Sequence, residues 1–159
     1  MKIIKPSFEI LDQQDGLEGI YKQIELAGRT CYKSEDKITE DSAKGFVERM
    51  VKSGHGAMLE HGTVYLKIPL NGPKRQFREI IVAFYRENKY SKVNVVSSAE
   101  GDFAYITTNY RVIAEGNFLK DLEYICDATK YHIKRVSVRF ICDRGVTHEF
   151  VRHKILCVA

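Results

Sequence analysis

The strongest constraint on the fold is a segment, residues 63–70, in which aliphatic residues occupy every second position. Val64, Leu66 and Ile68 would occupy one face of an extended chain there, and more polar residues the other. The segment Arg135–Ile141 alternates in the same way. Period-two patterns of this kind are typical of strands with one buried face. We therefore expect two strands, at 63–70 and 135–141, that are neighbours in one sheet.

The rest of the chain switches between helical and extended patterns. Gly54 is expected to end one helix in the left-handed conformation. Asn109 is expected to cap the helix that includes Val112, and Asp143 the last helix. The expected helices are approximately 16–30, 43–53, 77–88, 112–125 with an interruption at Gly116, and 144–157. Shorter strands are expected at 2–12, 92–97 and 103–108. Alternating elements without a linker predict one α/β or α+β domain over residues 1–159, with a mixed sheet flanked by helices.

Length and composition exclude several classes of protein. The 159 residues suffice for one domain with a full core, and 44% hydrophobic and 29% charged residues are typical of a globular protein. The longest apolar run, Ile80–Tyr85, is too short to cross a bilayer, and the N-terminus lacks the features of a signal peptide. The four cysteines lack zinc-site spacing, so we expect free thiols and no metal. We expect a cytoplasmic protein that has no membrane partner.

Positive charge is concentrated near the C-terminus. Residues 130–154 contain seven basic and two acidic residues, whereas the whole chain has a net charge of +4. Arg152, His153 and Lys154 are consecutive and follow Glu149 on the last expected helix. Arg offers a planar fork of donors and Lys a compact charge, which favours a phosphate-bearing partner. A solvated basic surface is the alternative interpretation.

A polar, glycine-containing loop with two histidines precedes the first alternating strand. His55, Glu60 and His61 place three titratable groups there, as functional loops often do. Their spacing does not match a helical zinc motif, and the chain has no glycine-rich phosphate loop. A nucleotide would therefore have to be bound by cationic side chains and helix ends. The alternative is that these histidines cap or pack against helix ends.

Three segments, taken in order, resemble the flavin-dependent thymidylate synthases, the ThyX family. Ala27–Tyr32 is similar to that family's A-x-R-x-[SC]-[FY] stretch, and His55–His61 is similar to its H-x-x-x-x-E-H loop. Thr147–Lys154 is similar to the strand-to-helix segment that ends in R-H-R. A further block, Tyr105–Arg111, resembles an insertion found in some members. The resemblance therefore covers most of the chain.

The resemblance implies a ThyX-like fold and an enzyme that methylates deoxyuridylate (dUMP) to thymidylate (dTMP). Methylenetetrahydrofolate would provide the carbon, and FAD, reduced by NADPH, would provide the hydride. The residues implied to contact FAD are His55, Glu60, Arg152, His153 and Lys154. Glu149 and Arg152 would line the dUMP pocket, and Arg152 and His55 would be catalytic. The family also implies a cytoplasmic homotetramer with active sites shared between subunits.

The resemblance stops within the R-H-R motif, because the Ser and Arg that grip the substrate in the family would lie beyond Ala159. Lys154 stands in place of the last Arg and cannot bind in a bidentate manner. We therefore expect an incomplete ThyX-like domain that is inactive alone, whether a shortened form, an interrupted gene product or a decayed paralogue. Two other functions remain open: a non-catalytic nucleotide-binding or assembly remnant, and a basic nucleic-acid-binding domain. Nucleic acid is the less favoured partner, because the chain has no RNP-like motif, KH loop or zinc finger.

Overall fold

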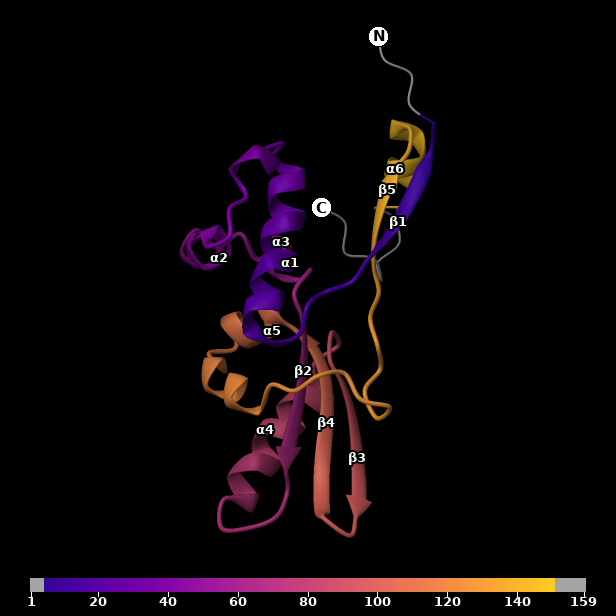
Figure 1. The fold of residues 1–159 in the computed structure, drawn as a ribbon. Helices are drawn as coiled ribbons and strands as arrows, with labels where there is room; N and C mark the ends of the chain where they lie inside the picture. Colours follow the sequence, from indigo (N-terminus) through magenta and orange to yellow (C-terminus); the bar gives the residue numbers. More distant parts are fainter. Residues whose placement is uncertain (1–4, 151–159) are drawn as a thin grey trace.

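The computed structural model describes residues 5–150 of the chain (Figure 1). It is an α+β structure with a three-stranded and a two-stranded antiparallel sheet. The elements in chain order are β1 (Ser7–Leu11), α1 (Gly16–Cys31), the 3-10 helix η1 (Glu35–Lys37), α2 (Ser42–Lys52), α3 (Gly56–Leu59), β2 (Thr63–Pro69), α4 (Arg75–Glu87), β3 (Lys92–Ser98), β4 (Gly101–Asn109), α5 (Tyr110–Glu115), the 3-10 helix η2 (Leu119–Tyr124), β5 (Ser137–Ile141) and α6 (Arg144–Phe150). Among these residues, no helix combines the length and apolar character needed to cross a membrane.

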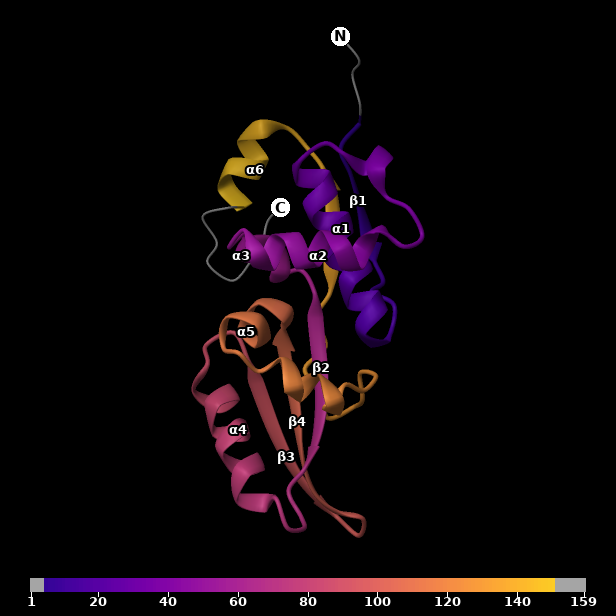
Figure 2. The ribbon, with the colours of Figure 1, turned by 90° about the vertical axis from the view of Figure 1, so that its left-hand side faces the viewer.

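The central sheet consists of β2, β4 and β3, in that order, and both pairings are antiparallel. Its inner face includes Val64, Leu66 and Ile68 of β2, which are fully buried. Ile106 of β4 pairs with Leu66 and is buried as well. Helix α4 runs along this sheet in both views (Figure 1, Figure 2). The alternating pattern of residues 63–70 therefore predicts the strand and its buried face correctly.

Helices α1, α2 and α3 pack together at one end of the central sheet (Figure 2). The apolar stripe of α1 faces this contact, because Ile20 and Ile24 are almost fully buried. Within α1, Arg29 Nη2 forms an ion pair with Glu25 Oε1 at 3.2 Å, and Ser42 Oγ of α2 donates to Glu25 Oε2 at 2.8 Å, which joins the two helices. A buried carboxylate needs such partners, so this cluster sets how α1 meets the start of α2.

β1 and β5 form a separate two-stranded ribbon, which lies beside α1 and away from the central sheet (Figure 1). Phe8 pairs with Phe140 across the ribbon, and these side chains are 69% and 50% exposed. Glu9 and Arg139, which alternate with them, form an ion pair. The ribbon therefore has one apolar and one charged face.

The prediction that strands 63–70 and 135–141 are neighbours in one mixed sheet is wrong. β5 begins at Ser137 and pairs with β1, β2 pairs with β4, and every strand pairing among the described residues is antiparallel. An alternating pattern specifies which face of a strand is buried but not which strand is its neighbour. The β3–β4 hairpin supplies the neighbour of β2. The other edge of β2 is occupied by Gln13, whose side-chain amide bonds to the Thr63 backbone at 2.8 and 2.9 Å.

The helix signals in the sequence place most helix ends correctly. Asn109 caps α5, because its side chain accepts a hydrogen bond from the Val112 backbone N–H at 3.0 Å. Gly54 follows α2 with a φ of 71°, a conformation that glycine adopts without strain. The helix expected after Val112 ends at Gly116, and η2 follows. Helix α3 lies where the sequence pattern indicates only a loop, and the last expected helix lies within the described residues only as Arg144–Phe150.

Candidate functional site

Two of the predicted site residues, His55 and Glu60, flank the short helix α3. His55 is the N-cap of α3, and Glu60 is its C-cap. Met58 and Leu59 are buried, so they anchor α3 to the core and hold both of its ends at the surface. His55 is exposed, whereas the side chain of Glu60 is only 17% exposed. The predicted loop is therefore a fixed helical turn with His55 on its outer side.

Tyr32, at the C-terminal end of α1, is the nearest aromatic partner of His55. Its Oη lies 3.0 Å from His55 Nδ1, within hydrogen-bonding distance. The two rings are 6.4 Å apart between centroids and tilted by 30°. Tyr32 is 49% exposed, so the pair forms a small aromatic surface that remains open to solvent. In the sequence, Tyr32 stands out only as the last residue of a family-like segment. Nothing in the sequence pattern indicates that it contacts His55.

Arg111 is a site residue that sequence reasoning missed. Its Nη1 lies 2.6 Å from Glu60 Oε1, and its Nε lies 2.7 Å from Glu115 Oε1. Its hydrogen bond to Glu115 and, to a lesser extent, its hydrogen bond to Glu60 raise the pKa of the Arg111 guanidinium. A Cβ atom on Gly56 would lie only 2.7 Å from Arg111 Nε, so the guanidinium rests against the α3 backbone. The i, i+4 spacing of Arg111 and Glu115 on an expected helix is the signal that could have found this pair.

The third predicted segment is described only in part. Asp143 precedes α6, and its Oδ1 accepts a hydrogen bond from a first-turn backbone N–H at 3.1 Å, so the predicted cap is confirmed. Glu149 is exposed near the end of α6. Arg152, His153 and Lys154 lie outside the described residues, and their approach to the α3 turn therefore stays a prediction.

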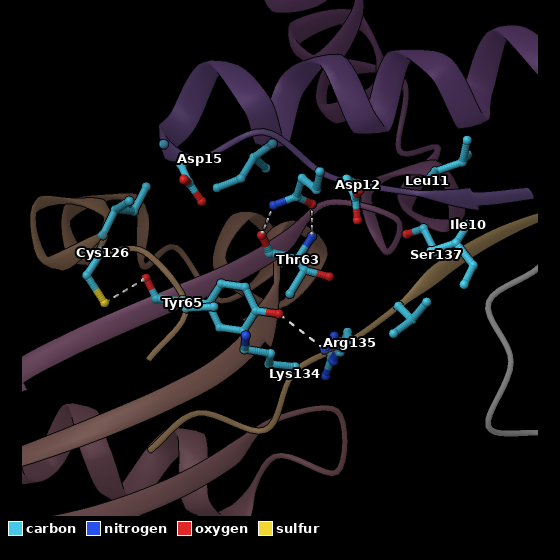
Figure 3. Close-up of a pocket in the computed structure, with 16 residues that line it drawn as sticks. Ile10, Leu11, Asp12, Asp15, Thr63, Tyr65, Cys126, Lys134, Arg135 and Ser137 are labelled. Atoms are coloured by element: carbon cyan, nitrogen blue, oxygen red, sulfur yellow. Dashed lines mark hydrogen bonds between the residues drawn. The ribbon is translucent and has the colours of Figure 1, made fainter. Parts of the chain in front are cut away.

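A cavity of about 250 Å³ lies between the N-terminal end of α1, the start of β2 and the segment that leads into β5 (Figure 3). Asp12 and Asp15 line it on the side of α1, and Lys134 and Arg135 line it on the opposite side. None of the predicted site residues that the structure describes lines this cavity. The cavity lies next to the N-terminal end of α1, whereas Tyr32 follows the C-terminal end of that helix. Among the described residues, the cavity and the α3 turn have no lining residue in common.

Several polar groups around the cavity are already engaged in the fold. The Arg135 backbone N–H donates to Tyr65 Oη at 3.1 Å, and its guanidinium donates to the carbonyls of Thr108 and Tyr90. Burial raises the pKa of the Cys126 thiol. The thiol therefore stays protonated near neutral pH, which makes it a poor nucleophile. We assign no reaction to this cavity.

The described residues contain no cluster of three or more His, Cys, Asp or Glu side chains that could hold a metal ion. The structure brings His55 and Glu60 to one helical turn and adds Tyr32 and Arg111 to them. Comparison of the chain with protein-family models, curated proteins and solved structures found no match.

Proposed function

We propose that the protein is a cytoplasmic homo-oligomer of the flavin-dependent thymidylate synthase family, whose members methylate dUMP to dTMP with methylenetetrahydrofolate and NADPH. The observation that supports this most directly is the contact between Tyr32 and His55. Tyr32 ends the first of the family-like segments, and His55 begins the second. Their polar atoms are 3.0 Å apart although 23 positions separate them in the chain. Segments that contribute to one site must converge in the fold, and these two do.

The α3 turn offers a surface of the kind that a flat ring system needs. The exposed rings of His55 and Tyr32 lie side by side and can pack against the isoalloxazine of FAD. Arg111 bonds to Glu60 at the other end of α3, which fixes the orientation of the turn and so of His55. FAD, when bound, supplies the hydride chemistry.

The charge balance of the α3 turn limits what it can bind. Glu60 and Glu115 bring two carboxylates to one guanidinium, that of Arg111. This arrangement does not attract a diphosphate, which needs forked or clustered cations. We therefore assign the diphosphate of FAD to the basic segment Arg152–Lys154 and the dUMP pocket to Arg152 and Glu149, as the resemblance implies.

A titration of FAD followed by quenching of the flavin fluorescence tests this proposal. His55→Ala and Tyr32→Ala should each weaken the affinity for FAD by roughly 5- to 150-fold, the range for losing one aromatic stacking partner. Phe77→Ala is the matched control, because it removes an aromatic side chain that is 62% exposed on α4. Failure of the wild-type chain to bind FAD, or equal affinities in all three variants, would contradict the proposal.

A second measurement separates an enzyme from a nucleotide-binding remnant. Tritium release from dUMP labelled at C5, in the presence of NADPH and methylenetetrahydrofolate, reports the reaction itself. Release that is lost in Arg152→Ala would support catalysis by this chain. FAD binding that depends on His55 without tritium release would identify a binding module that retains the flavin surface but not the activity.

A further inference from the structure

The free edges of the two sheets differ in how well they are protected. An unprotected edge strand pairs readily with a further strand, and proteins usually block this with charges or a covering segment. The outer edge of β2 is covered. Gln13 bonds to the Thr63 backbone there, and the Cys126 backbone N–H donates to the Tyr65 carbonyl at 3.0 Å. These contacts leave little of the β2 backbone for another chain.

The two ribbon strands are protected by charge. Glu9 is the middle residue of β1, and Arg139 is the middle residue of β5. If either strand paired with the same strand of a second copy in a centred antiparallel register, two like charges would lie directly opposite each other. Such pairs are destabilising. The edges of the ribbon are therefore poorly suited to self-pairing.

β3 forms the outer edge of the central sheet and is less protected (Figure 1). A loop contacts it through a hydrogen bond from the Asn94 side chain to the Tyr131 carbonyl at 3.2 Å, which leaves the strand backbone uncovered. Apart from its ladder with β4, the backbone of residues 92–98 makes no hydrogen bond to other parts of the described chain. No charged residue occurs between Val93 and Ala99. Val95, the middle residue of β3, is 43% exposed. The strand is thus a seven-residue edge with free backbone groups and an uncharged centre.

We propose that β3 pairs antiparallel with β3 of a second copy of this chain, across a two-fold axis at Val95. This register places Val95 opposite its own copy, Asn94 opposite Val96, and Lys92 opposite Ser98. The pairing joins two three-stranded sheets into one continuous sheet and satisfies the outward backbone groups of both strands. The proposal does not depend on the assignment of a flavin enzyme.

The charges at the two ends of β3 favour a second copy of this chain as the partner strand. The exposed Lys92 begins β3, and the exposed Glu100 lies just beyond its last residue. In the centred register Lys92 faces Ser98 of the second copy, and Glu100 of that copy lies in the turn that follows Ser98. Opposite charges therefore lie at the same end of the strand pair. The two-fold axis repeats this arrangement at the other end.

The dimer should be weak, because strand addition buries less surface than the roughly 800 Å² per partner of a standard interface. Sedimentation velocity over a concentration series measures its association. Lys92→Glu and Glu100→Lys should each weaken association about tenfold, since each places like charges at both ends of the strand pair. The double variant, which exchanges the charges, should restore it. Lys120→Glu, on η2, is the control and should have no effect.

Disulfide trapping tests the register itself. Val95→Cys would place two thiols directly opposite each other, at a Cα separation of about 4.5–5.5 Å that a disulfide spans. Mild oxidation should therefore produce a covalent dimer, in which peptide mapping finds the two introduced thiols joined to each other. Ser98→Cys should not crosslink to itself, because its symmetry mate is about six residues away along the strand. A monomer at every concentration, equal crosslinking of both variants, or a failed rescue by the charge exchange would each overturn the proposal.

Discussion

Removing a single hydroxyl group from the buried side of α4 should destabilise the whole structure. Tyr85 is fully buried, and its Oη donates to Asp121 Oδ2 of η2 at 3.0 Å. Burial raises the pKa of Asp121, and the hydrogen bond from Tyr85 partly offsets that effect. A hydrogen bond to a charged group contributes about 1.5–3 kcal/mol. Tyr85→Phe should therefore lower the free energy of unfolding by about 2 kcal/mol at pH 7.5, and Tm by roughly 4–8 °C.

The same substitution should have a smaller effect in acid. Without the hydroxyl group of Tyr85, the pKa of Asp121 rises further above its ordinary value of 3.8. A carboxyl group whose pKa is raised by folding is stabilised as the acid, so its burial becomes less costly as the pH falls toward that raised pKa. Urea unfolding at pH 7.5 and 4.5 should show a smaller difference from wild type at 4.5.

Tyr124→Phe is the matched control for this experiment, because the Tyr124 hydroxyl makes no hydrogen bond to the described residues. Its loss should lower the free energy of unfolding by less than about 0.5 kcal/mol. A Tyr85→Phe variant as stable as wild type at pH 7.5, or equally destabilised at both pH values, would refute the reasoning.

Two further substitutions test the attachment of the ribbon and the pH response of the core. Gln13→Ala removes both hydrogen bonds to the Thr63 backbone, so it should lower the free energy of unfolding by about 1–2 kcal/mol. It should also speed hydrogen exchange at the Thr63 amide. A substitution of the exposed Gln14 should change neither quantity. Burial lowers the pKa of His132 below 6.5, so the unfolded chain takes up protons first and stability should fall as the pH falls from 7 to 5.5. In denaturation experiments, the free energy of unfolding of His132→Asn should fall less steeply over this pH range. The fall that remains is attributed to His61, because burial lowers its pKa as well. A pH dependence equal to that of the wild type would contradict this.

Local signals in this sequence predict local structure well. The alternation around Leu66 gives the buried face of β2, and Asn109 marks the start of α5, because both depend on residues within a few positions. The partner of β5 could not be predicted in this way. Its pairing with β1 joins Ser7 to Ile141, and nothing in either strand's pattern distinguishes that neighbour from β2.

The candidate site shows the same limit. His55 and Glu60 could be singled out from composition and spacing, since they lie within one loop. Their partners could not, because Tyr32 reaches His55 only through the length and packing of α1, and Arg111 reaches Glu60 from 51 positions away. Side chains that complete a site from distant segments leave no periodic signal in a single sequence.

The ribbon also imposes an order on folding during synthesis. Glu9 leaves the ribosome early, but its partner Arg139 is 130 positions further along the chain. At about 5–20 residues per second, β1 must wait roughly 7–26 s before β5 exists. Phe8 and Ile10 are exposed to mispairing throughout that interval. A nascent chain of this protein should therefore bind chaperones through its N-terminal strand and release them only after residue 141 has emerged.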